Sequence, residues 1–175
     1  MVERDRGLES LKGRVGMNDK DGAAEREWHM KTAIGLFNAV WGLLDRTDRT
    51  PAEDDRMVHA AHASRYHWGE VGTPLEFERG EWQISRVYSV LGRPEPALHH
   101  AMRCLEICRE NGITDFDIAF AYEAMARASA VAGDAEGCSE YIELGRQAGQ
   151  QIEDEENRNY FLSELDAVTR ILRDR

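Results

Sequence analysis

Apolar residues recur at helical spacing along most of the chain, and no stretch shows the strict alternation that predicts a half-buried β-strand. In the first long example, over residues 24–46, the apolar face consists of Met30, Ile34, Phe37, Trp41 and Leu44. In the last, over 155–173, it consists of Phe161, Leu165, Val168 and Leu172. Between these two, the same spacing predicts helices over 52–70, 75–91, 94–111, 115–132 and 135–151. The pattern therefore predicts an all-α protein of about seven antiparallel helices joined by short loops.

Local signals fix several of the predicted helix ends. The segments 50–53 and 73–76 both read Thr-Pro-x-Glu. Each places a hydroxyl at the N-cap, proline at the first helical position and glutamate at the third, and all three choices favour a helix start. Three glycines follow helical patterns at places where a residue without Cβ can adopt the left-handed cap, namely Gly92, Gly112 and Gly133.

The first 23 residues differ from the rest of the chain. They alternate charged residues with four glycines and carry no sustained apolar face. Each glycine weakens a helix by roughly 1 kcal/mol. We therefore expect a mobile N-terminal arm over 1–23 and a single helical domain over 24–175, in which the last helix acts as a cap.

An internal repeat of 41 residues indicates how the helices are arranged. Seven positions recur at this spacing: Ile84, Ser85, Tyr88, Gly92, Ala97, Ala101 and Cys104 return as Met125, Ala126, Ser129, Gly133, Cys138, Ile142 and Gly145. An apolar residue, a small neighbour, an aromatic residue three further on and small residues in the next helix resemble the tetratricopeptide-repeat pattern, although the period is longer than the usual 34. The resemblance covers 24–151 and implies stacked helical hairpins; a closed helical bundle is the alternative. The stretches 59–68 and 80–100 also resemble a bacterial family of helical proteins, which implies no particular chemistry.

Composition narrows the classes of partner. The formal net charge of −11 disfavours a sequence-independent nucleic-acid binder and docking on anionic membranes. No run approaches the roughly 18 apolar residues that a membrane-spanning helix needs. The three cysteines form no Cys-x-x-Cys pair and all fall inside helical patterns, so we expect buried, reduced thiols in a cytoplasmic protein.

The most unusual stretch is 57–71, which reads as a helix with two distinct faces. One face is apolar, with His67 near its edge, and the other carries His59, His62, Tyr66 and Glu70. His59 and His62 lie three residues apart, so their imidazoles can reach one metal ion, with His29, His99 or His100 on another helix as further candidate ligands. No His-Glu-x-x-His motif accompanies them, so we predict no metal or cofactor and favour hydrogen bonds across a helix interface.

The sequence favours a binding function over catalysis. It contains neither a nucleophile elbow nor a phosphate-binding glycine loop, so we expect no enzyme activity. In stacked hairpins the first helix of each pair lines the binding face. The polar residues predicted there are Arg79, Glu81, Gln83, Arg86, Glu123 and Arg127.

Two hypotheses follow. The favoured one is a helical scaffold that binds a protein or peptide partner. In it, Arg79 and Arg86 are candidate ligands for a carboxylate, and the histidine stripe with His100 is a candidate interface, which includes a homo-oligomer. The alternative is a metal- or small-ligand-binding enzyme or sensor that uses the His59/His62 stripe.

Overall fold

The computed structural model describes residues 19–173, and within that range the chain forms seven helices and no strand. The all-α prediction is therefore confirmed. Except at the start of the first helix, every predicted helix end agrees with the structure within two residues. The helices are α1 (Asp19–Leu44), α2 (Pro51–Val71), α3 (Pro74–Val90), α4 (Pro94–Asn111), α5 (Asp115–Ala132), α6 (Ala135–Gly149) and α7 (Glu155–Arg173).

The first helix begins five residues earlier than the predicted position 24. The helix includes Gly22, one of the four glycines from which the mobile arm was predicted. The rest of the predicted mobile arm, residues 1–18, lies outside the described residues.

The predicted caps are present. Thr50 and Glu53 form a capping box in which Glu53 Oε2 accepts from the Thr50 backbone N–H at 2.8 Å. Thr73 and Glu76 repeat this arrangement at the start of α3. The three predicted cap glycines all adopt positive φ: 66° at Gly92, 63° at Gly112 and 78° at Gly133.

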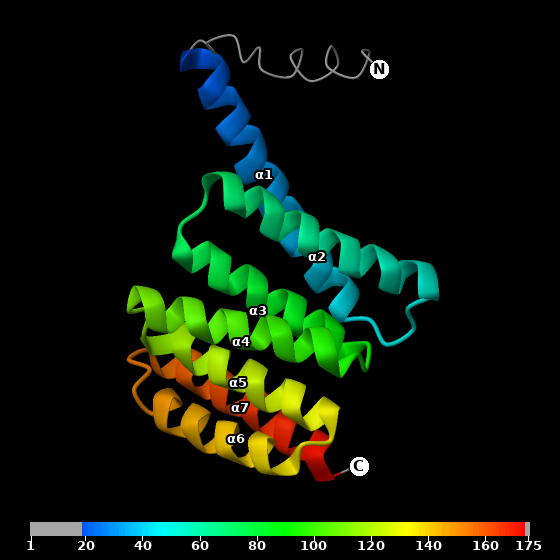
Figure 1. Ribbon diagram of the computed structural model, residues 1–175, viewed down its shortest axis with the longest axis vertical. Helices are drawn as coiled ribbons and strands as arrows, with labels where there is room; N and C mark the ends of the chain where they lie inside the picture. Colours follow the sequence, from blue (N-terminus) through cyan, green and yellow to red (C-terminus); the bar gives the residue numbers. More distant parts are fainter. Residues whose placement is uncertain (1–18, 174–175) are drawn as a thin grey trace, which may run out of the picture.

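The helices stack as hairpins in an open array, which Figure 1 shows running from α1 at one end to α6 and α7 at the other. Each helix packs on the next along the chain, and the odd-numbered helices also pack on one another in the order α1, α3, α5, α7. Among the described helices, the backbones of α2, α4 and α6 do not come close to one another, although the His62 and His100 side chains meet between α2 and α4; the backbones of α1 and α7 are also well separated. The array is therefore curved with its odd-numbered helices on the inner side, and it is not a closed bundle.

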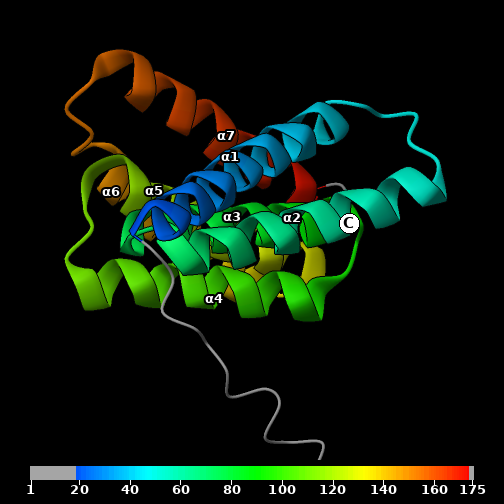
Figure 2. The ribbon, with the colours of Figure 1, turned by 90° about the horizontal axis from the view of Figure 1, so that it is seen from above.

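Seen from above, α4 lies along one edge of the molecule and α1 and α7 lie toward the opposite edge (Figure 2). The core fills the space between hairpins, and small residues allow close approach there. Ala97, Ala101 and Cys104, which belong to the predicted repeat, are fully buried. On α7 the predicted face is buried at Phe161, Leu165 and Val168. None of the described helices combines the length and apolar character required to cross a membrane.

Candidate functional site

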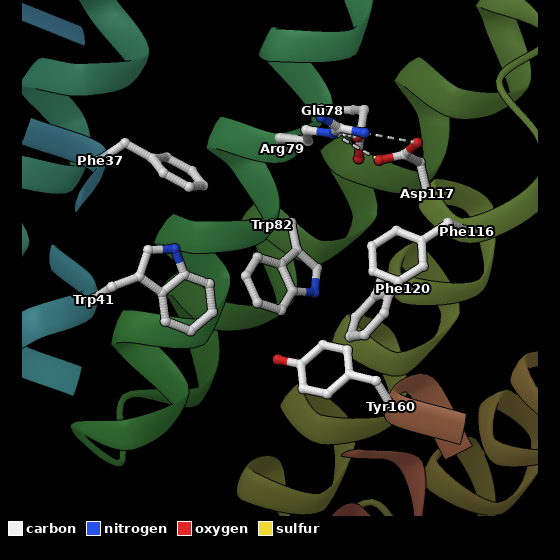
Figure 3. Close-up of a pocket in the computed structure, with 9 residues that line it drawn as sticks. All are labelled: Phe37, Trp41, Glu78, Arg79, Trp82, Phe116, Asp117, Phe120 and Tyr160. Carbon is white, nitrogen blue, oxygen red and sulfur yellow. Dashed lines mark hydrogen bonds and ion pairs between the residues drawn. The ribbon is translucent and has the colours of Figure 1, made fainter. Parts of the chain in front are cut away.

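A pocket of about 220 Å³ opens on the face formed by the odd-numbered helices. Each of those helices contributes to its wall, and α1, α3 and α5 each do so with a pair of residues four apart. Residues at this spacing lie on the same side of a helix, so both members of a pair face the pocket. The lining residues are Phe37, Trp41, Glu78, Arg79, Trp82, Phe116, Asp117, Phe120 and Tyr160 (Figure 3).

Six of the nine lining side chains are aromatic, and their rings form a continuous set. Trp82 lies between Trp41 on one side and Phe116, Phe120 and Tyr160 on the other (Figure 3). The Trp82 ring centroid is 5.5 Å from that of Trp41 and 5.6 Å from that of Phe120. Phe120 is in turn 5.8 Å from Tyr160. These separations fall in the range of favourable aromatic contacts, so the rings support one another around the cavity.

A pair of opposite charges lies beside the rings. Arg79 donates to both carboxylate oxygens of Asp117, at 2.7 and 3.1 Å, and the hydrogen bond to Asp117 raises the pKa of Arg79. Arg79 is exposed and Tyr160 is 48% exposed, so this part of the wall reaches the surface. Arg79 was a predicted ligand for a carboxylate of the partner; in the structure its guanidinium is held by Asp117.

A buried ion network lies behind Trp82. Its centre is Glu123, which is fully buried and accepts from Trp82 Nε1 at 3.2 Å, from Arg127 Nε at 2.6 Å and from Arg86 Nη1 at 3.3 Å. Arg86 also donates to Glu164 of α7 at 2.8 Å. The network therefore ties α3, α5 and α7 together and fixes the Trp82 indole.

This network corrects the prediction that the polar residues of the first helices form an open binding face. Gln83, Glu123 and Arg127 are all buried. The physical reason is that their polar groups are satisfied inside the protein; for example, Gln83 Nε2 donates to the Phe37 carbonyl at 3.0 Å. Arg86 forms ion pairs with Glu123 and Glu164, so its guanidinium is also bound within the protein.

An acid and two thiols lie together at the α3–α4 interface. Glu78 is 2% exposed, and its Oε2 accepts from Cys104 Sγ at 3.3 Å and from Cys108 Sγ at 3.9 Å. Its Oε1 has no hydrogen-bond partner and lies 3.6 Å from Arg79 Nε. Burial, together with the neighbouring Cys108 and Asp117, raises the pKa of Glu78 to about 10.

Two of the predicted histidines join a polar cluster on the other side of α3. His62 Nε2 lies 3.0 Å from the Tyr88 hydroxyl, and the ring centroids of His62 and His100 are 5.3 Å apart. His100 Nδ1 lies 2.7 Å from Glu81 Oε2, and Glu81 also accepts from Arg65 at 2.9 Å. The His62 side chain is exposed overall, but partial desolvation at the helix interface and the charge of His100 lower its pKa. Histidine contacts across helix interfaces are thus present, as the sequence predicted.

The remaining predicted site residues lie apart from this cluster. His67 Nδ1 is 2.9 Å from His29 Nδ1 of α1. His59 and Glu70 are exposed, and Tyr66 is 63% exposed. The structure therefore divides the predicted stripe among separate environments. Among the described residues, neither His59 nor His62 belongs to a group of three possible metal ligands; Glu78, Cys104 and Cys108 form such a group.

Comparison with known proteins gives no family for this chain. No family model, no curated protein and no solved structure matches it. The resemblance to tetratricopeptide repeats therefore stays a prediction from residue spacing, and the pocket and its surroundings supply the grounds for a function.

The aromatic pocket was not among the sites predicted from the sequence. Phe37 and Trp41 were assigned to the apolar face of the first helix, as ordinary core residues. The signal that could have identified them is the recurrence of aromatic pairs four residues apart on alternate helices: Phe37 and Trp41 on α1, then Phe116 and Phe120 on α5. Since alternate helices of a stacked array share one face, such pairs meet in space.

Proposed function

We propose that the chain is a tetratricopeptide-like binding module that holds an apolar side chain of a protein or peptide partner in the aromatic pocket. The observation that carries the proposal is the convergence of six aromatic side chains, from all four odd-numbered helices, on one cavity. Ligand sites in proteins are concave and mostly apolar, with a few polar groups that fix orientation. Large aromatic residues also dominate the energetics of protein interfaces.

The size and charge of the pocket favour an apolar group. Its volume of about 220 Å³ exceeds the roughly 150 Å³ of an engineered cavity that binds benzene. One large side chain therefore fits. The charges of Arg79 and Asp117 compensate each other, and the raised pKa of Glu78 keeps the other carboxyl group of the wall neutral when no cation is bound.

The surroundings of the pocket favour binding without rearrangement. The Trp82 indole is held by Glu123, and Glu123 is held by two arginines. Side chains that are already ordered lose little conformational entropy when a ligand arrives, and pre-organisation of this kind improves affinity.

We also propose a cytoplasmic location for this module. Cys104, Cys108 and Cys138 are all buried and unpaired. Free thiols of this kind are typical of proteins in reducing compartments.

The test is a selection of peptides from a random phage-displayed library on the full-length protein, followed by titration of the selected peptides against variants. We expect Trp41→Ala and Tyr160→Ala to weaken binding by about tenfold or more, since truncation of a central aromatic contact typically costs at least about 2 kcal/mol. Trp28→Ala is the matched control, because Trp28 is 57% exposed and lies outside the pocket lining. Failure to enrich any peptide, or equal binding to wild type and both pocket variants, would overturn the proposal.

A further inference from the structure

We propose that Glu78, Cys104 and Cys108 form a binding site for a thiophilic divalent cation next to the aromatic pocket. Zinc is the ion that we expect there. One ligand atom from each of these residues lies within 4.8 Å of the other two, and all three residues are buried. This site does not depend on what the aromatic pocket binds.

The helices bring the three groups together from two sides. Cys104 and Cys108 are four residues apart on α4, so both thiols lie on one face of that helix. Glu78 projects from α3, which packs against that face. With Zn–S near 2.3 Å and Zn–O near 2.1 Å, a tetrahedral ion holds its sulfur and oxygen ligands roughly 3.6 Å apart. The observed separations from Glu78 Oε2 are 3.3 Å to Cys104 Sγ and 3.9 Å to Cys108 Sγ, on either side of that value.

The arrangement is poorly explained as ordinary core packing. A buried carboxyl between two thiols has only weak hydrogen-bond donors, and burial of a polar group without strong partners is costly. Glu78 Oε1 has no hydrogen-bond partner although Glu78 is only 2% exposed. An apolar side chain would fill the same space without this cost. The nearest charge to Oε1 is Arg79 Nε at 3.6 Å, beyond hydrogen-bond distance, and that guanidinium is bound to Asp117. A cation shared by the carboxylate and the thiolates would give the acid a closer partner.

The donor set selects the class of metal. Two thiolates favour zinc and other thiophilic ions over magnesium and calcium, which prefer oxygen ligands. Three protein ligands leave one tetrahedral position for water or another donor. Glu78 also lines the aromatic pocket, so the ion can reach the cluster from that pocket.

The test is a titration of cobalt(II), a spectroscopic substitute for zinc, into the purified, reduced, metal-free full-length protein. We expect one cobalt ion per chain, with thiolate-to-cobalt charge-transfer absorption in the near ultraviolet that disappears when zinc is added. Absence of this absorption from the wild-type protein would overturn the proposal before any variant is made.

Variants locate the site. Loss of an outer-shell partner already lowers metal affinity by about 10- to 100-fold, so Glu78→Gln, which removes a ligand, should weaken cobalt binding by more than about tenfold. Cys104→Ser/Cys108→Ser should abolish the charge-transfer absorption, while Cys138→Ser, at a buried thiol outside the cluster, should retain it. If the double variant does not fold by circular dichroism, the single Cys108→Ser replaces it. Absorption that survives loss of the cluster thiols, or that depends on Cys138, would contradict the assignment.

Discussion

At the scale of single residues, the environment of Glu123 affects both the pocket and the stability of the fold. Its carboxylate is fully buried, it accepts from Trp82 in the pocket wall, and it pairs with two arginines. A buried charge of this kind is tolerated because its partners satisfy it. The same network therefore links the shape of the pocket to the stability of the fold.

Replacement of Glu123 by alanine should be strongly destabilising. The substitution removes the fully buried carboxylate from Arg86 and Arg127 and leaves them with the partly exposed Glu164. Breaking a buried ion pair costs about 3–5 kcal/mol. Urea denaturation followed by circular dichroism measures the loss in unfolding free energy. Glu164→Ala is the matched control. The Glu164 side chain is 23% exposed, so water can solvate the arginine groups that lose their partner, and the loss of unfolding free energy should be smaller. An equal effect of the two substitutions would contradict the role given to Glu123.

The cluster around His62 predicts lower stability in mild acid. Partial desolvation and the charge of His100 lower the pKa of His62 below its ordinary value of 6.5. The unfolded chain therefore binds a proton at a higher pH than the folded protein does. Between these two values the unfolded state binds more protons, and stability falls as the pH falls. The pKa of Glu81 is also lowered. Burial alone would raise it, but the contacts with His100 and Arg65 outweigh burial. Glu81 therefore stabilises the folded protein at pH values above its ordinary pKa of 4.5. This stabilisation is lost as the pH falls through the lowered pKa of the folded state.

Unfolding free energies measured at pH 7.5, 6.0 and 5.0 check this expectation. The wild-type protein should lose stability across the series, and His62→Gln should show a smaller loss. His99→Gln serves as the control, because His99 is not among the groups that shift the pKa of His62 or Glu81. Stability that is constant or rises toward pH 5.0 would show that the environment of His62 is described incorrectly.

At the scale of helices, the N-terminal caps offer a matched comparison. Thr73 caps α3 with a capping box, whereas Thr114 stands at the N-cap of α5 without a side-chain hydrogen bond. Thr73→Ala should therefore lower the unfolding free energy by about 1 kcal/mol, and Thr114→Ala should cost clearly less. Thermal denaturation of both variants under one set of conditions makes the comparison. A larger loss in Thr114→Ala would contradict the cap assignment.

The helices themselves were predictable because their signals are local. The proline and capping box at 73–76 fix the start of α3, and Gly112 fixes the end of α4, without reference to any other part of the chain. Only the start of α1 was wrong by more than two residues. There the helix includes Gly22, one of the four glycines from which a mobile arm was predicted.

The candidate sites were much less predictable because they depend on contacts between helices. The spacing of His59 and His62 indicated a shared ligand, but in the structure His62 meets Tyr88 and His100, while His59 belongs to no group of three possible metal ligands among the described residues. Nothing in the local sequence around Glu78 indicates that it lies against two thiols 26 and 30 residues away. Such pairings follow only from the order in which hairpins stack.

At the scale of the whole molecule, the curvature of the array explains where the pocket lies. The backbones of the odd-numbered helices approach one another, whereas those of the described even-numbered helices stay further apart. Side chains on the inner faces of α1, α3, α5 and α7 therefore converge, and six of those that meet are aromatic. The pocket is thus a property of the stacked array, because no single hairpin contains its wall.

The most direct test of the pocket uses the tryptophans as reporters. The chain has four tryptophans, of which Trp41 and Trp82 line the pocket while Trp28 and Trp68 do not. Fluorine NMR of protein labelled with 5-fluorotryptophan, with resonances assigned by Trp→Phe variants, follows titrations with N-acetylphenylalaninamide, N-acetyl-lysinamide and N-acetylglutaminamide. We expect the phenylalanine derivative to shift the Trp41 and Trp82 resonances and to leave those of Trp28 and Trp68 in place. Equal shifts of all four, no shift at Trp41 and Trp82, or stronger shifts with the lysine or glutamine derivative would contradict an apolar binding pocket.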